Sequence, residues 1–317
     1  GRVQSTLLSI LMDHETLIES FQSEYSYDFM GTFSFATPGV PGVLEGLDVT
    51  TECELLFSVD EIEPIEIMKI LIKDRKFKIY DSKVSEEKKY PGSPLITSSL
   101  QQSSQNEFGL SVKTTMDIAQ KLFENGKITY MRTDSTFISP DFQKTIQQKI
   151  ETDYSIEYYH KYSAKSKKVK GAQEAHECIR PTDISHNLSD KWGELEIKVY
   201  NLIKKRTIIS HMKPASYNVL TIDLCNNNFD SIGIFRGKYK SLKFKGYLIY
   251  TKPDIECSEQ IKIPKNTIFT LKTSICQDIE SSPPQYYNES SIVKKLESSG
   301  IGRPSTYASI LSTLYNR

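Results

Sequence analysis

The segment Ile128-Thr129-Tyr130-Met131-Arg132-Thr133-Asp134-Ser135 alternates briefly and then runs into a polar turn. Side chains two positions apart on a strand share a face, so the pattern predicts a short strand on which Tyr130 and Arg132 point together. Ile128 and the stem of Met131 are expected to reach apolar neighbours. The segment therefore brings a phenol and a guanidinium to one place.

This pair of side chains suits phosphoryl transfer. A tyrosine hydroxyl can attack a phosphodiester and form a covalent intermediate, but a pKa of about 10 leaves it protonated at neutral pH. Arg132 is always charged and forks onto phosphate oxygens, so it would stabilise the pentavalent transition state and the departing phenolate. Taken alone, a Tyr-x-Arg pair is more often an exposed pair on a surface strand. Other segments have to decide between these readings.

The composition is that of a soluble globular chain with two or three domains. Forty basic residues balance forty acidic ones among 317 residues, so the net charge of zero gives no support for a nucleic-acid ligand. No apolar run approaches the roughly 20 residues of a spanning helix, and no signal peptide opens the chain. We expect an intracellular protein without a membrane partner.

The cysteines and the chain ends bear on the compartment and on completeness. The five cysteines are scattered and never spaced as CxxC, which argues against a disulfide framework and a structural zinc site. We expect reduced thiols. The chain begins at Gly1 without methionine and stops at Arg317 inside a predicted helix, so we expect a fragment.

Apolar periodicity predicts strands on both sides of a helical middle segment. Helices are expected at 3–22, 61–73, 111–123, 139–150, 190–211, 290–299 and from 307 onward. Strands are expected at 25–35, 49–58, 77–80, 217–224, 231–235, 241–250 and 268–275. A stretch rich in Ser, Gln, Pro and Gly, 82–104, is expected to be a domain boundary. Because strands return after the middle helices, we expect a helical domain inserted into a β layer.

Two helix starts carry polar groups that suit a DNA phosphate, since backbone amides at a helix N-terminus attract anions. The first opens the chain, and the last follows a turn at Gly300 in a helix-turn-helix arrangement. Each could equally be an ordinary first turn. The residues are Arg2, Gln4 and Ser5 at the first helix, and Arg303, Ser305 and Thr306 at the last.

The middle of the chain contains a further polar cluster. Five lysines in 161–170 directly precede a segment with His176 and Arg180, which we expect to form a helical turn halted by Pro181. A lysine run is usually a solvated loop. His176 lacks a histidine four residues away, so a metal reading is weak and no metal ligands are assigned.

Four of these segments, in this order and spacing, resemble type IA DNA topoisomerases of the bacterial topoisomerase I branch. They are Gly1–Ser5, Ile128–Ser135, Ala175–Thr182 and Gly300–Ser309. Pro91–Pro94 with Ile96-Thr97 and Leu100-Gln101-Gln102, and Ser282–Pro284, look like further signatures of that family. The likeness covers nearly the whole chain.

The resemblance implies that Tyr130 attacks one DNA strand, becomes joined to the 5′ phosphate, lets another strand pass and reseals the break, which relaxes negative supercoils. Arg132 would position the scissile phosphate, and His176 would assist as a hydrogen-bond donor. A phosphotyrosine bond keeps the phosphodiester energy, so no ATP is needed, and the chain has no GxxxxGK[ST] loop. The DNA-binding residues implied are Arg2, Gln4, Ser5, Arg180, Arg303, Ser305 and Thr306, with Arg180 also holding the His176 turn.

The family fold implied is a ring-like, multi-domain α+β body. Its domains would be a helical DNA-binding domain (1–36 and 288–317), a β-rich arch (37–89 and 217–287) and a helical domain with the active-site tyrosine (90–216). The family's magnesium-binding Toprim domain would precede Gly1, so Mg²⁺ is the expected cofactor, with its ligands outside this chain and the fragment alone incomplete as an enzyme. The partner implied is single-stranded or underwound DNA, bound by a monomer in the cytoplasm, nucleoid or nucleus. Cys178 stands where alanine is common in the family.

Two alternatives stay open. The chain could belong to a module that binds single-stranded nucleic acid without cutting it, which a DxDxE cluster upstream of Gly1 would argue against. A rolling-circle or recombinase-type tyrosine nuclease is weaker, because neither a histidine metal pair nor a wide Arg/His/Arg set is present.

Overall fold

The computed structural model describes residues 2–35, 49–56, 63–163, 176–228 and 233–315. The chain divides into two compact units, each assembled from separate stretches of sequence. The helical unit comprises residues 1–21, 90–214 and 284–317, and the barrel unit comprises residues 22–89 and 215–283. Strands therefore do recur on both sides of the helical middle segment.

The helical unit is built from amphipathic helices that share two apolar cores. Its helices are α1 (Arg2–Glu19), α3 (Thr97–Phe108), α4 (Val112–Glu124), α5 (Pro140–Asp153), η1 (Ile156–Tyr158), α6 (Glu194–Ile209), α9 (Glu289–Ser298) and α10 (Tyr307–Tyr315). One core joins α3, α4 and α6, and the other joins α1, α9 and α10. The Ser111 hydroxyl caps α4 by accepting a hydrogen bond from the Thr114 amide at 3.0 Å. Gly126 follows α4 with a φ of 65°, the left-handed conformation that commonly ends a helix at a glycine.

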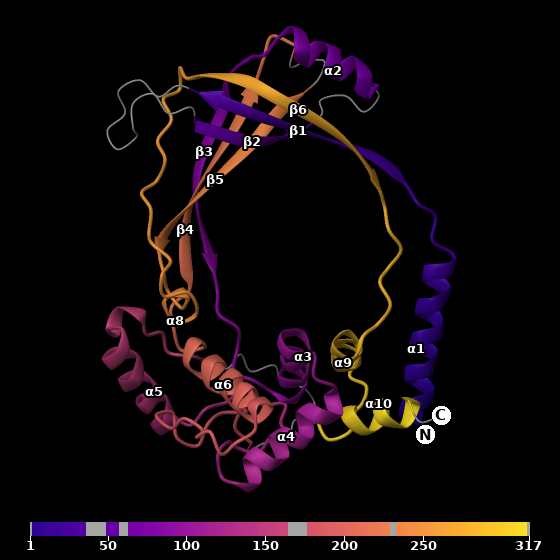
Figure 1. The fold of residues 1–317 in the computed structure, drawn as a ribbon, viewed down its shortest axis with the longest axis vertical. Helices are drawn as coiled ribbons and strands as arrows, with labels where there is room; N and C mark the ends of the chain where they lie inside the picture. The colour runs from indigo at the N-terminus through magenta and orange to yellow at the C-terminus, as the bar shows by residue number, and fades with distance from the viewer. Residues whose placement is uncertain (1, 36–48, 57–62, 164–175, 229–232, 316–317) are drawn as a thin grey trace. The chain divides into compact units, whose positions relative to one another are not determined.

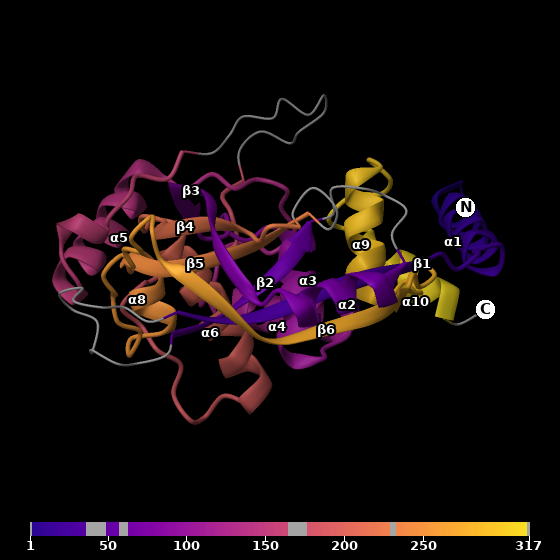
Figure 2. The ribbon, with the colours of Figure 1, turned by 90° about the horizontal axis from the view of Figure 1, so that it is seen from above.

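The barrel unit is a closed antiparallel sheet in the order β1-β2-β5-β4-β3-β6. Its strands are β1 (Tyr25–Phe35), β2 (Val49–Leu56), β3 (Lys76–Lys89), β4 (Ala215–Cys225), β5 (Ile234–Phe244) and β6 (Ile268–Glu280), accompanied by the helices α2 (Pro64–Lys73) and α8 (Leu248–Thr251). β1 and β6 run side by side (Figures 1 and 2). Phe33, Phe77 and Phe235 fill the interior edge to face, with ring centroids 5.0 to 5.6 Å apart.

The boundary expected within 82–104 lies where the chain passes from one unit to the other, whereas the two separate strands expected at 231–235 and 241–250 were wrong. Residues 82–104 carry regular structure, because β3 pairs with β4 as far as Lys89 and α3 follows. Burial of Thr97, Gln101 and Ser104 overrides the weak helix propensity of a Ser/Gln-rich sequence. The junction between the units, at Lys89 and Tyr90, does lie inside this stretch. The strands predicted at 231–235 and 241–250 correspond to one strand, β5, followed by α8. The division into three domains stays a prediction, although β1 belongs to the barrel unit.

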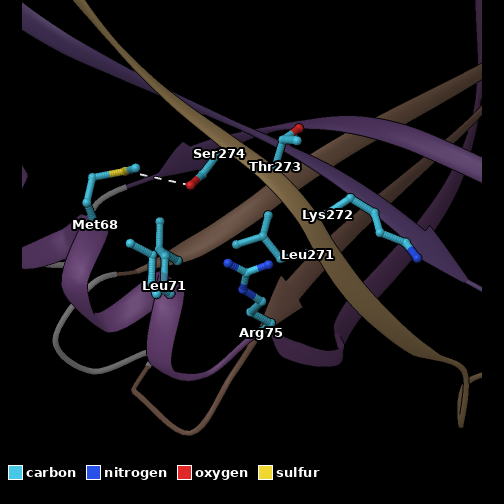
Figure 3. Close-up of a pocket in the computed structure, with 8 residues that line it drawn as sticks. Met68, Leu71, Arg75, Leu271, Lys272, Thr273 and Ser274 are labelled. Atoms are coloured by element: carbon cyan, nitrogen blue, oxygen red, sulfur yellow. Dashed lines mark hydrogen bonds between the residues drawn. The ribbon is translucent and has the colours of Figure 1, made fainter.

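A shallow cleft of about 250 Å³ opens on the barrel unit between α2 and β6 (Figure 3). Met68 and Leu71 line it from α2, and Leu271 and Ser274 line it from β6, with Arg75 at its edge. None of the residues expected to act on DNA lies in it. No helix among the described residues combines the length and apolar character that a bilayer crossing requires.

Gly31 of β1 lies where the barrel core leaves no room for a side chain. A Cβ there would lie 2.7 Å from Phe33 Cε2 and 3.0 Å from both Leu271 Cδ1 and Phe235 Cε1. We expect Gly31→Ala to destabilise the barrel unit by about 1–3 kcal/mol, because the rings have to shift within a packed core. Urea unfolding followed by circular dichroism measures this. Exposed Ser26 of the same strand supplies the control, Ser26→Ala, and equal midpoints for the two variants would contradict the expectation.

Candidate active site

Tyr130 lies in a short irregular segment with bends at Thr129, Met131 and Arg132, here called the Tyr130 turn, and not on the strand that the alternation predicted. The strand-like pairing described for residues 128–135 is a single isolated bridge between Ile128 and Pro181. The prediction was wrong because the backbone beyond Ile128 bonds to the start of α3 and to the segment 178–180, and none of the described strands runs alongside it. Ile128 and Met131 are buried in the helical core, as predicted.

The start of α3 holds one side of this turn. The Thr97 hydroxyl donates to the Met131 carbonyl at 2.7 Å and lies 3.1 Å from the Thr133 carbonyl. It also accepts a hydrogen bond from the Thr133 amide at 2.8 Å. The Thr97 amide donates to the Thr133 carbonyl at 2.9 Å. Thr97 was not among the predicted site residues, and its only signal in the sequence was its position in a family signature.

The segment that contains His176 holds the other side. The Thr129 hydroxyl donates to the Cys178 carbonyl at 2.7 Å and accepts from the Arg180 amide at 3.0 Å. Leu95 and Ile179 form a second isolated bridge. Residues 176–180 are therefore extended, and the helical turn expected there was wrong over these residues because their backbone pairs with neighbouring segments. Residues 164–175, with four of the five lysines of the predicted basic run, lie outside the described residues.

These contacts bring His176 beside Tyr130. The two ring centroids are 5.7 Å apart with an interplanar angle of 41°, and the Phe123 ring packs edge-on against Tyr130 at 5.4 Å. Tyr130 is half-buried, so its side chain is packed against its neighbours and still partly exposed. An imidazole and a phenol that are distant in the sequence thus share one surface.

Arg132 is exposed next to this pair. Among the described residues its guanidinium has no ion pair or side-chain hydrogen bond, although its backbone neighbours Met131 and Thr133 are both fixed by Thr97. A guanidinium with open donors on an anchored backbone is suited to bind a phosphate.

Arg180 was expected to bind DNA and to hold the His176 segment. Its guanidinium already interacts with neighbouring side chains. Its guanidinium pairs with Glu177 and stacks 3.7 Å from the centre of the Phe142 ring. Glu177 also accepts a hydrogen bond from the Ser139 amide at 2.6 Å, at the start of α5. Burial raises the pKa of the Glu177 carboxyl, but the bonds from Ser139 and Arg180 outweigh it, so the pKa lies below its ordinary value of 4.5.

Glu177→Gln is expected to loosen the His176 segment and to lower stability near neutral pH. A carboxyl with a lowered pKa in the folded state stabilises the fold above about pH 4.5, and this contribution is lost as the pH falls through the lowered value. The difference in unfolding midpoint between the parent and the variant should therefore be largest near pH 7 and shrink in acid. The exposed pair of Glu194 and Lys198 provides the control, Glu194→Gln, which should change little at either pH. A pH-independent difference for Glu177→Gln would contradict this account.

The turn before α10 is closed by Thr306. Its hydroxyl accepts from the Arg303 amide at 2.8 Å and donates to the Arg303 carbonyl at 3.0 Å, while Arg303 and Ser305 are exposed. Burial, and then the negative charges of Glu297 and Asp134, raise the pKa of Tyr307 against a lowering effect of Arg303. Asp134 follows the Tyr130 turn closely, so this turn and the start of α10 lie within electrostatic range of each other.

Arg2, Gln4 and Ser5 occupy the first turn of α1, as the periodicity predicted. Gln4 is half-buried and Ser5 is exposed, and both already interact within the protein. α1 shares its core with α9 and α10 through Leu7. The two helix starts expected to contact DNA thus belong to the same unit as Tyr130.

The described residues offer no metal site. No three His, Cys, Asp or Glu side chains among them lie close enough together to hold an ion. The Cys178 thiol is buried, and burial raises its pKa to about 12, so it is neither a thiolate ligand nor a nucleophile. The expected magnesium requirement remains a prediction.

Comparison with known proteins gives a consistent result. A family model described as DNA topoisomerase matches residues 1–317. The chain is 36% identical to a mimivirus protein named DNA topoisomerase 1 type prokaryotic and 36% identical to DNA topoisomerase 1 of Rickettsia bellii, and 32% identical to that of Escherichia coli. Each match takes in the whole chain but only 40%, 42% and 36% of these relatives.

A solved structure agrees with these relatives. Full-length topoisomerase I from Thermotoga maritima superposes with a TM-score of 0.78 at 30% identity, covering the whole of this chain and 51% of that one. The match confirms the expected α+β fold class.

Proposed function

The chain belongs to the DNA topoisomerase family, of the bacterial type IA kind, and from this premise we propose that the protein containing it relaxes negative supercoils by cutting and resealing one DNA strand through Tyr130. The observation that carries the proposal is a half-buried Tyr130 held beside the His176 ring and next to an exposed Arg132. The chain spans about two fifths of its curated relatives, so the activity is proposed for the whole protein.

The chemical step is a transesterification. The Tyr130 oxygen attacks a backbone phosphorus, the bond from phosphorus to the 3′ oxygen breaks, and the tyrosine becomes joined to the 5′ phosphate. The phenol proton leaves, and the departing 3′ oxygen takes up a proton. Attack by that 3′ hydroxyl reverses the step after another strand has passed. One phosphoester replaces another, so no ATP is consumed.

The neighbouring side chains have separate tasks in this step. Arg132 binds the non-bridging oxygens of the scissile phosphate, where negative charge grows in the transition state. His176 donates a hydrogen bond beside it. Arg303 and Ser305, with Arg2, Gln4, Ser5 and Thr306, line the path of the strand at two helix starts. The burial of Arg180 and its pairing with Glu177 favour the supporting role for its guanidinium, so it holds the His176 segment.

The proposal includes a cofactor and a substrate. Mg²⁺ is the proposed cofactor, but the described residues do not fit a metal ion. The substrate is single-stranded or underwound DNA, bound by a soluble, intracellular monomer. Single strands expose the phosphate to in-line attack more readily than a stacked duplex does.

Covalent trapping tests the proposal. The full-length protein is incubated with Mg²⁺ and a labelled single-stranded oligonucleotide, denatured, digested and mapped by peptide mass. We expect an adduct that joins Tyr130 to the 5′ side of the break. Binding without any adduct would overturn the proposal and favour a module that holds single strands. An adduct on another residue would overturn the choice of nucleophile.

A further inference from the structure

We propose that Thr97 is a positioning residue for the cleavage step, acting through the backbone on both sides of Arg132. This inference rests on the proposed function, because it concerns how Arg132 is aimed at the phosphate that Tyr130 attacks. The hydrogen bonds of the Thr97 hydroxyl go to the backbone of Met131 and Thr133 and not to Tyr130. Its effect passes through Met131 and Thr133.

One hydroxyl satisfies three backbone groups of the turn. Thr97 Oγ1 donates to the Met131 carbonyl oxygen at 2.7 Å, lies 3.1 Å from the Thr133 carbonyl oxygen, and accepts a hydrogen bond from the Thr133 amide at 2.8 Å. The Thr97 amide adds a fourth bond, to the Thr133 carbonyl at 2.9 Å. Arg132 is thus the single residue between two anchored neighbours.

The hydrogen bonds between Thr97 and the turn are buried, and the helix that carries Thr97 is held in place. Thr97 is 0% exposed, and Met131 and Thr133 are 0% and 2% exposed, so water cannot replace a lost hydroxyl. α3 is fixed at its start, where the Ile96 amide donates to the Ser99 hydroxyl at 2.9 Å, and Leu100 packs in the helical core. Removal of the hydroxyl leaves the buried Met131 carbonyl and Thr133 amide without that partner. We expect the backbone of the turn to shift so that these groups find other partners.

The movement would fall on Arg132 more than on Tyr130. Tyr130 keeps its ring contacts with Phe123 and His176, and Thr129 ties the preceding backbone to the Cys178 carbonyl. Arg132 has no side-chain partner of its own among the described residues, so its guanidinium follows the backbone. A displacement of about 1 Å at a catalytic group lowers a rate by up to about 10²-fold.

The test uses the full-length protein, four variants and one control variant. Single-turnover cleavage of a labelled single strand, its Kd and the thermal midpoint are measured for Thr97→Val, Thr97→Ser, Arg132→Ala and the double variant Thr97→Val with Arg132→Ala. We expect Thr97→Val to cleave about 10- to 100-fold more slowly with a Kd close to the parent's, and Thr97→Ser to recover most of the rate. The matched control is Thr207→Val, since Thr207 is also 0% exposed but its hydroxyl donates only to the Ile203 carbonyl of its own helix.

The double variant separates positioning from a loss of fold. If Thr97 acts through Arg132, the double variant should be no slower than Arg132→Ala, because the two changes remove one interaction. Losses that multiply, or a Thr97→Val rate equal to the parent's, would overturn the inference. If Thr97→Val does not fold, Thr97→Cys takes its place. The cysteine side chain is of similar size but forms weaker hydrogen bonds, and it is combined with Arg132→Ala in the same double-mutant comparison. Adduct formation by Tyr130→Phe would instead overturn the proposed function and leave the Thr97 geometry untouched.

Discussion

A Tyr130→Phe variant of the full-length protein is expected to form no covalent adduct with a single-stranded oligonucleotide while binding it about as tightly as the parent. The change removes the attacking oxygen and nothing else. Phenylalanine retains the ring contacts with Phe123 and His176, so the turn keeps its packing. Adduct formation on denaturing gels, together with binding by fluorescence anisotropy, measures the two properties separately.

A second tyrosine provides the matched control. Tyr90 belongs to the same unit and is 70% exposed, so Tyr90→Phe also removes an accessible hydroxyl. This variant should give the parent's full level of adduct. A Tyr130→Phe protein that still captures the strand at that level would show that Tyr130 is not the nucleophile.

Arg132→Ala is expected to reduce the cleavage rate by about 10²-fold or more, because a guanidinium that meets charge growing in the transition state contributes most to the chemical step. Stability should change little, since Arg132 is exposed and has no ion pair among the described residues. Single-turnover kinetics at saturating oligonucleotide measure the rate, and thermal unfolding measures the stability.

Arg132→Lys tests how the charge acts. Lysine keeps the positive charge but loses the planar fork that binds two phosphate oxygens, so an intermediate rate is expected. A rate for Arg132→Ala equal to the parent's would return Arg132 to the role of an exposed surface residue. Equal rates for the lysine and alanine variants would argue that geometry matters more than charge.

Elements with a strong period were predictable from the sequence. α1 and α4 follow apolar residues at helical spacing and appear where that spacing predicts them. α3 was not predictable, because its serines and glutamines carry little helical signal and only burial against other helices stabilises it. β3 was predicted too short, since exposed alternating charges reveal a strand only when a partner such as β4 is known.

Some features of the candidate site were likewise predictable from the sequence, and others were not. The chemistry proposed for Tyr130 and Arg132 follows from residue types at close spacing, so the sequence by itself was enough to propose Tyr130 as the nucleophile and Arg132 as its cationic partner. It misjudged their backbone as a strand, and it expected His176 and Arg180 to share a helical turn. Local periodicity cannot reveal pairings between segments far apart in the chain.

Those long-range pairings decided how the side chains of the site are placed relative to one another. The 5.7 Å approach of the His176 and Tyr130 rings depends on bonds from Thr129 to the segment 178–180. The anchoring of Arg132 depends on Thr97, which lies on a helix that the sequence did not predict. The sequence determined which reactive groups the protein has, and the tertiary structure decided where they stand, because buried backbone groups have to find partners and find them across the fold.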